Sequence, residues 1–269
     1  MTKPKVATFS TGNGRYYTHP ATGDKVPGVT TILNMLPKPF LKAWGEKMVA
    51  TAAVEALADP AKGAWLPDMA KADPEGAIDW LKSAPRRNTR EAENIGSAAH
   101  GLFEAILLGR SVSIEDEALA VFARHYENLL ETVSVKPIHT EETVWNTTHS
   151  YAGSFDLFGE VSGEKCWVDN KTTRSGVYPE VALQLSAYAH GEVLVDPHTG
   201  EDKPIPKGSR GLVFHVRPEG WKIYEVPIGE EVFEHFLHLR QTFVWDAASR
   251  SIVGKPLIAG AAPAKKVIL

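Results

Sequence analysis

The chain of 269 residues can bury a substantial core and is long enough for one large domain or two small ones. Its formal net charge of −4 argues against a coat protein that binds nucleic acid by charge alone, so any anion-binding face has to be a local patch. The one cysteine, Cys166, excludes an internal disulfide framework and a cysteine-ligated zinc or iron–sulfur site. Together with an N-terminus that lacks the apolar run of a signal peptide, this predicts a cytoplasmic protein without a membrane segment.

The N-terminal part of the chain predicts short strands followed by helices. Residues 15–18 and 25–30 alternate as strands do around a turn at 21–24, and residues 39–58 fit a helix. Residues 59–88 are rich in proline, aspartate and lysine, which indicates short helices and loops. We therefore expect residues 1–88 to form one mainly helical region.

The rest of the chain predicts helices first and then strands. The apolar spacing and turn residues indicate, in order, helices over 89–108 and 115–132, strands over 140–145, 150–161 and 165–172, a helix over 179–191, a loop at 196–204, strands over 210–216 and 221–226, and a helix over 230–249. The predicted fold class is α/β or α+β, with a central mixed β-sheet flanked by helices. Residues 89–250 would form this core and residues 251–269 a C-terminal tail.

Two acids and a lysine fall on the hairpin predicted over 150–172. Asp169 and Lys171 are two positions apart on one strand, so their side chains share a face, and Asp156 lies on the strand that pairs with it. Two carboxylates at one point suit Mg²⁺ or Mn²⁺. An Asp-x-Lys pattern alone is common on surface hairpins. Here, however, Trp167 and Val168 indicate a buried strand, on which unpaired charges would be costly.

Two predicted helices carry further polar residues at helical spacing. Gly96 and His100 share one face of the helix over 89–108, and a glycine inside a helix costs roughly 1 kcal/mol relative to alanine, which close approach of another group would explain. His100 is then a metal ligand or phosphate contact, or else a half-buried histidine bonded to a carbonyl. Gln184 and Tyr188 could likewise bond to a nucleic-acid backbone or orient Lys171 and the metal ligands; alternatively Gln184 caps the helix or faces solvent and Tyr188 packs in the core.

Several other charged residues are weaker candidates. Glu142 precedes Asp156 by one strand and would add a carboxylate, in which case Glu141 points to solvent. Arg86, Arg87 and Arg90 cluster before the helix of Gly96 and either contact phosphates or form a solvated basic turn.

Taken together, these motifs resemble one known family. Gly-x-x-x-His, Gly-x-x-Asp, Asp-x-Lys-Thr and Gln-x-x-x-Tyr occur in this order between Gly96 and Tyr188 and are similar to the RecB-type branch of the PD-(D/E)xK nuclease superfamily. The chain departs from the superfamily name in having Phe155 before Asp156, as is usual in that branch. CRISPR-associated relatives carry cysteines for an iron–sulfur cluster, which one cysteine excludes here.

The resemblance implies a restriction-endonuclease-like core and a role for each matching residue. His100, Asp156 and Asp169 would bind Mg²⁺ or Mn²⁺, as one or two ions, and Lys171 would assist the attacking water. Gln184 and Tyr188, with Gly96 and Thr172, would contact DNA and support the lysine. Residues 1–88 would cap the DNA path.

The implied activity is that of a metal-dependent DNA exonuclease, phage-encoded and acting in replication or recombination. The protein would act in the host cytoplasm. Its partners would be DNA and, as a further candidate, a single-strand annealing or other recombination protein. It could also form an oligomer. Three alternatives stay open: a branch or flap endonuclease, a catalytically inactive DNA-binding module, and a metal-binding protein without nuclease activity.

Overall fold

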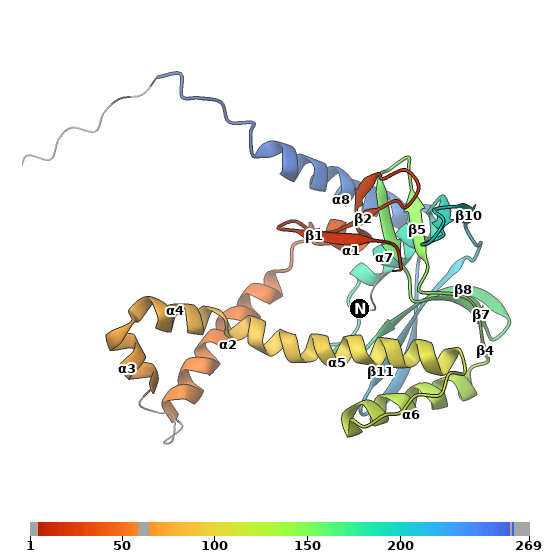
Figure 1. Ribbon diagram of the computed structural model, residues 1–269, viewed down its shortest axis with the longest axis horizontal. Coiled ribbons are helices and arrows are strands. Elements are labelled where there is room, and N and C mark those ends of the chain that lie inside the picture. Colours follow the sequence, from red (N-terminus) through yellow and green to blue (C-terminus); the bar gives the residue numbers. More distant parts are fainter. Residues whose placement is uncertain (1–4, 59–64, 259, 261–269) are drawn as a thin grey trace, which may run out of the picture.

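The computed structural model describes residues 5–58, 65–258 and 260, and for residues 91–93 it describes the backbone only. Figure 1 shows a mixed α/β core from which a helical arm projects, with helix α8 leaving in another direction. The expected fold class is therefore confirmed. Among the residues described, no helix is both long and apolar enough to cross a membrane.

The central sheet has five strands in the order β12-β11-β8-β7-β4. β11 runs parallel to β8 and the other neighbours are antiparallel, so the sheet is mixed as expected. The hairpin of β7 and β8 closes through Ser162 and Gly163, both at positive φ, which matches the twist of the flanking strands. The strand bounds are β4 Val135–Thr140, β7 Leu157–Val161, β8 Glu164–Lys171, β11 Arg210–Arg217 and β12 Gly220–Val226.

Alternating residues of β8 face two separate helical layers. Trp167 packs in one buried cluster with residues of α1, α7 and α8, whereas Val168 packs in another with residues of α5 and α6. This alternation puts Asp169 and Lys171 on the side of Trp167, and Asn170 on the side of Val168. The helix bounds are α1 Val29–Leu33, α5 Ala84–Leu107, α6 Glu117–Thr132, α7 Glu180–Ala189 and α8 Glu230–Ser249.

Two smaller antiparallel sheets pack beside this core, in the orders β1-β2-β3 and β10-β9-β5-β6. Two predicted strands are wrong. Residues 140–145 and 150–161 are not single strands, because each segment breaks and passes from one sheet to another. The breaks lie at Glu141, whose φ is 51°, and at Phe155 and Asp156. The bounds are β1 Thr8–Thr11, β2 Gly14–Thr18, β3 Lys25–Pro27, β5 Thr143–Asn146, β6 Tyr151–Ser154, β9 Val193–Val195 and β10 Asp202–Pro204.

The projecting arm consists of α2 (Pro39–Ala58), α3 (Trp65–Ala72) and α4 (Pro74–Lys82), which return to the core through α5 (Figure 1). The helix α5 begins at Ala84 instead of Thr89. It therefore runs across the boundary placed at residues 88 and 89, and the division into separate units stays a prediction.

Candidate metal centre

Two aspartates are brought together where β7 and β8 meet the second sheet. Leu157 pairs with Val168, so the next positions along the hairpin, Asp156 and Asp169, are neighbours. Asp156 lies in the break between β6 and β7, and its Oδ2 accepts a hydrogen bond of 2.7 Å from the backbone N–H of Asn170. Asp169 is only 2% exposed. The hairpin thus places two carboxylates side by side, as the sequence predicted.

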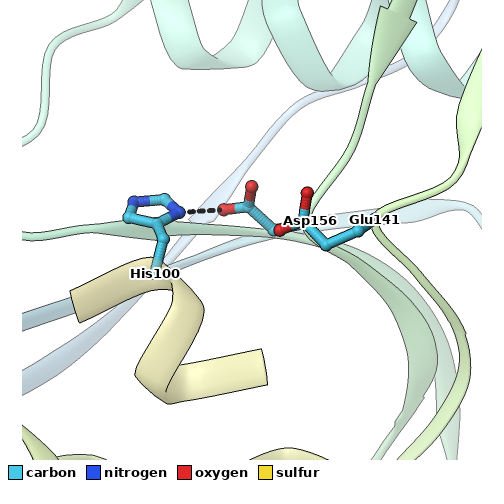
Figure 2. A group of neighbouring side chains, drawn as sticks. All are labelled: His100, Glu141 and Asp156. Atoms are coloured by element: carbon cyan, nitrogen blue, oxygen red, sulfur yellow. Dashed lines mark ion pairs between the residues drawn. The ribbon is translucent and has the colours of Figure 1, made fainter. Parts of the chain in front are cut away.

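Three side chains from separate parts of the chain, His100, Glu141 and Asp156, lie close together (Figure 2). One potential ligand atom from each of His100, Glu141 and Asp156 lies within 4.8 Å of the others. His100 comes from α5, Glu141 from the connection between β4 and β5, and Asp156 from the break between β6 and β7. The His100 Nδ1 is 3.4 Å from the Asp156 Oδ2. These imidazole and carboxylate donors suit a divalent metal.

The structure corrects the assignment of Glu142. It is Glu141 that is buried, with 6% exposure, beside Asp156, whereas Glu142 bonds to His139 at 3.1 Å. Strict strand alternation predicted the opposite, but it fails because Glu141 has a positive φ and belongs to no strand. The Glu141 N–H donates to the backbone carbonyl of Asp156, which joins the two connections. A positive φ at a glutamate has no sequence signal.

The second aspartate is held by a lysine and a glutamine. The Lys171 Nζ lies 2.7 Å from the Asp169 Oδ2. The Gln184 Nε2 donates to the Asp169 Oδ1 at 2.9 Å and to the Tyr188 hydroxyl at 3.2 Å. Gln184 therefore supports Asp169 directly and Tyr188 supports it through Gln184, in keeping with their helix spacing, and through Asp169 they restrain Lys171.

The two aspartates differ in their electrostatics. Burial alone would raise the pKa of Asp156, but His100, Lys171 and the Asn170 N–H outweigh it and hold the pKa below its usual value. Burial raises the pKa of Asp169, and the neighbouring Asp156 adds to this increase. Burial would lower the pKa of His100, yet the Asp156 carboxylate raises it overall. A cation bound here would therefore displace protons from His100 and Asp169, the two groups whose pKa is raised.

Four buried polar atoms at this site lack a well-aligned hydrogen bond within the described part of the chain. Two of them, the His100 Nδ1 and the Asp169 Oδ2, are in ion-pair contact with Asp156 and Lys171, and the others are the Asn170 Oδ1 and the Tyr126 hydroxyl. Buried polar atoms are normally fully hydrogen-bonded, so this site has capacity for a further polar ligand. The donor set and these atoms fit Mg²⁺ or Mn²⁺ with its water. Tyr126 and Asn170 were not predicted; only the position of Asn170 inside the Asp-x-Lys motif pointed to it.

Gly96 and Thr172 lie against each other beside this site. A Cβ on Gly96 would be 3.4 Å from the Thr172 Oγ1, which is a contact that an alanine tolerates. The close approach that was expected to explain the glycine is therefore mild.

The three arginines lie elsewhere. They were placed in a turn before the helix, but α5 begins at Ala84 and includes them. At 1.5 Å per residue, Arg86 lies about 21 Å and Arg90 about 15 Å from His100 along the helix. Both are exposed, and Arg87 packs over the Trp80 ring at 4.3 Å. They do not belong to the metal centre.

Comparisons with known proteins give no family. No family model and no curated protein matches the chain. One similar solved structure, titled "Crystal structure of SSO0001", is 12% identical with a TM-score of 0.27, and the match covers 48% of this chain and 61% of that one. The match thus spans less than two thirds of that structure and carries no argument about fold or function.

Proposed function

We propose that this protein is a metal-dependent nuclease that hydrolyses phosphodiester bonds in DNA, of the RecB-type PD-(D/E)xK kind that its motifs resemble. The observation that carries the proposal is the convergence of His100, Glu141 and Asp156 beside an Asp169–Lys171 ion pair, where four buried polar atoms lack a well-aligned hydrogen bond among the described residues. A surface hairpin with unrelated charges would not gather these groups from four segments.

The metal would be held by His100, Glu141, Asp156 and Asp169, and three carboxylates with one imidazole favour Mg²⁺ or Mn²⁺. When bound, such an ion lowers the pKa of an attacking water and neutralises charge in the transition state. The role of Glu141 goes beyond the sequence pattern and replaces that proposed for Glu142.

Lys171 supplies a fixed positive charge at the edge of this site. Burial alone would lower its pKa, but Asp169 and Asp156 raise it, so the amine is protonated at neutral pH in the metal-free protein. This charge would orient the attacking water and offset the negative charge that develops on the phosphate. Gln184 positions Asp169, and Tyr188 positions Gln184.

We further propose that the enzyme acts as an exonuclease, as the resemblance implies, in phage DNA replication or recombination. The complete set of two aspartates, lysine and glutamine supports an active enzyme over a module that binds DNA without cleaving it.

The test is cleavage of end-labelled linear duplex DNA and of covalently closed circular DNA, with Mn²⁺ and with EDTA. Loss of the linear DNA alone, dependent on Mn²⁺, is the expected result. Cutting of the circle would replace the exonuclease by an endonuclease. If neither these substrates nor branched and flap DNA is cut while Mn²⁺ binds, the nuclease proposal is wrong.

A further inference from the structure

An aromatic pair lies where the arm leaves the core, and the metal centre does not use it. Phe40, at the start of α2, stacks on Tyr178, which precedes α7, with ring centroids 5.1 Å apart and planes 9° from parallel. Phe40 remains 44% exposed although Tyr178 covers one of its faces. A flat, exposed ring backed by a second ring offers a stacking surface for a planar ligand.

The pair is fixed in place at the helix that supports the metal centre. The Lys38 Nζ and the Glu180 Oε1 are 3.0 Å apart and tie the chain before α2 to the first turn of α7. Glu180 lies one helical turn before Gln184, whose amide donates a hydrogen bond to Asp169. Phe40 and Tyr178 are each two residues from a member of this ion pair. The rings therefore lie at the start of the helix whose next turn holds Asp169.

The surroundings of the pair carry positive charge. Lys42, two residues beyond Phe40 on α2, and Arg174, in the loop that leads to Tyr178, are both exposed. Lys42 also lines a shallow groove along α2 that reaches the start of α5, together with Leu41, Val49, Lys82 and Pro85, and with Glu46 as an acid. Exposed aromatic rings between cations are the surface to which single-stranded nucleic acids bind.

We infer that Phe40, backed by Tyr178, stacks on a base of an unpaired DNA strand beside the metal centre, while Lys42 and Arg174 contact its phosphates. The inference rests on the proposed nuclease function and adds a substrate form to it: DNA whose end is unpaired. A base has an aromatic face whatever its sequence, so the contact recognises single strands without sequence preference.

The test measures binding to wild-type protein and variants in EDTA, where hydrolysis is absent, by fluorescence anisotropy. The probes are duplexes with a 5′ or 3′ single-stranded overhang, the same duplexes with an abasic overhang, and a blunt duplex. The abasic strand keeps the phosphates and lacks the bases. The wild-type protein is expected to prefer one normal overhang over its abasic counterpart.

Phe40→Ala should weaken binding of the normal overhang about 5- to 150-fold, the range of one lost base stack, and leave the abasic overhang unchanged. Phe40→Trp, which keeps an aromatic ring, should retain the preference for the normal overhang. This result would show that the effect of Phe40→Ala comes from the lost ring and not from a loss of folding. Phe9→Ala is the matched control, because Phe9 lies on β1, stacks on Tyr16 at 5.4 Å and is similarly exposed.

Equal binding of normal and abasic overhangs by the wild-type protein would overturn the inference, and so would an unchanged preference in Phe40→Ala or no DNA binding at all. Because this is a binding measurement, it is separate from the nuclease proposal. If the protein hydrolyses DNA but binds normal and abasic overhangs equally, only the inferred base stacking on Phe40 is wrong. Preference for bases without hydrolysis refutes the nuclease alone.

Discussion

At the scale of single residues, Lys171 differs from Lys165, the other lysine of β8, in having a buried ion-pair partner, Asp169. We expect Lys171→Met to reduce cleavage by about 10²-fold or more, the usual effect of removing one group that stabilises transition-state charge. The circular dichroism spectrum should be unchanged. Lys165→Met, which alters an exposed lysine of β8, is the control. Cleavage at the wild-type rate in Lys171→Met would remove this residue from the mechanism.

The same substitution has a pH-dependent effect on stability. Burial already raises the pKa of Asp169 above its usual 3.8, so this group favours the folded state when protonated and loses that contribution as the pH rises. Without the positive charge of Lys171 the pKa of Asp169 is higher still, so more stability is lost as the pH rises. The difference in unfolding temperature between the wild-type protein and Lys171→Met should therefore grow from acidic to neutral pH. A difference independent of pH would contradict the buried ion pair.

Glu141 and Glu142 provide a matched test of the metal ligands, because they are adjacent and only Glu141 faces Asp156. Glu141→Gln should weaken Mn²⁺ binding at least about tenfold, since even groups that only orient ligands contribute 10- to 100-fold. Glu142→Gln should leave it unchanged. Titration of Mn²⁺ by calorimetry decides between them, and the reverse result would restore the strand alternation predicted from the sequence.

His100 should make Mn²⁺ binding depend on pH. Its pKa is raised above 6.5, so the metal-free protein gains stability from protonated His100 below that value and loses it as the pH rises through the raised pKa. An ion must replace this proton, so Mn²⁺ affinity should increase with pH over the same window. His100→Ala should abolish this dependence and weaken metal binding more than DNA binding. His139→Ala, another histidine bonded to a carboxylate, should retain it.

At the scale of elements, Gly153 allows β6 to pack against α7. A Cβ at this position would lie 2.6 Å from the Tyr188 ring and 3.0 Å from Val29. Gly153→Ala should therefore cost about 1–3 kcal/mol of stability and disturb the Tyr188–Gln184–Asp169 chain, lowering cleavage. Gly96→Ala should be neutral or stabilising by up to ~1 kcal/mol. Thermal unfolding and cleavage rates of both variants check this, and a harmless Gly153→Ala would contradict the packing.

Local patterns predicted which elements exist better than where they end. The helices over 39–58 and 230–249 have the expected bounds, and Pro39 and Gly229 mark their starts. The prediction of single strands over 140–145 and 150–161 was wrong, because the chain passes from one sheet to another at Glu141 and at Phe155. Such a change depends on strands that are distant in the sequence. β9 and β10 were missed because they are short and depend on strand pairing, β9 with β5 and β10 with β9.

At the scale of the whole molecule, the site is assembled from segments whose proximity no local pattern reveals. The pairing of Asp156 with Asp169 could be predicted because one hairpin joins them. The places of Glu141 and Tyr126 could not, because they depend on how α6 and the β4–β5 connection pack on the sheet. The incomplete hydrogen bonding of buried polar atoms at this site is likewise a property of the folded chain alone.

The measurement that tests the central claim most directly is the release of labelled nucleotides from linear duplex DNA by the wild-type protein and by Asp169→Asn, which keeps the shape of the side chain and removes its charge. The account predicts release by the wild-type protein with Mn²⁺, and none with EDTA or from the variant. Release that persists in EDTA, or that Asp169→Asn retains at the wild-type rate, would contradict the account.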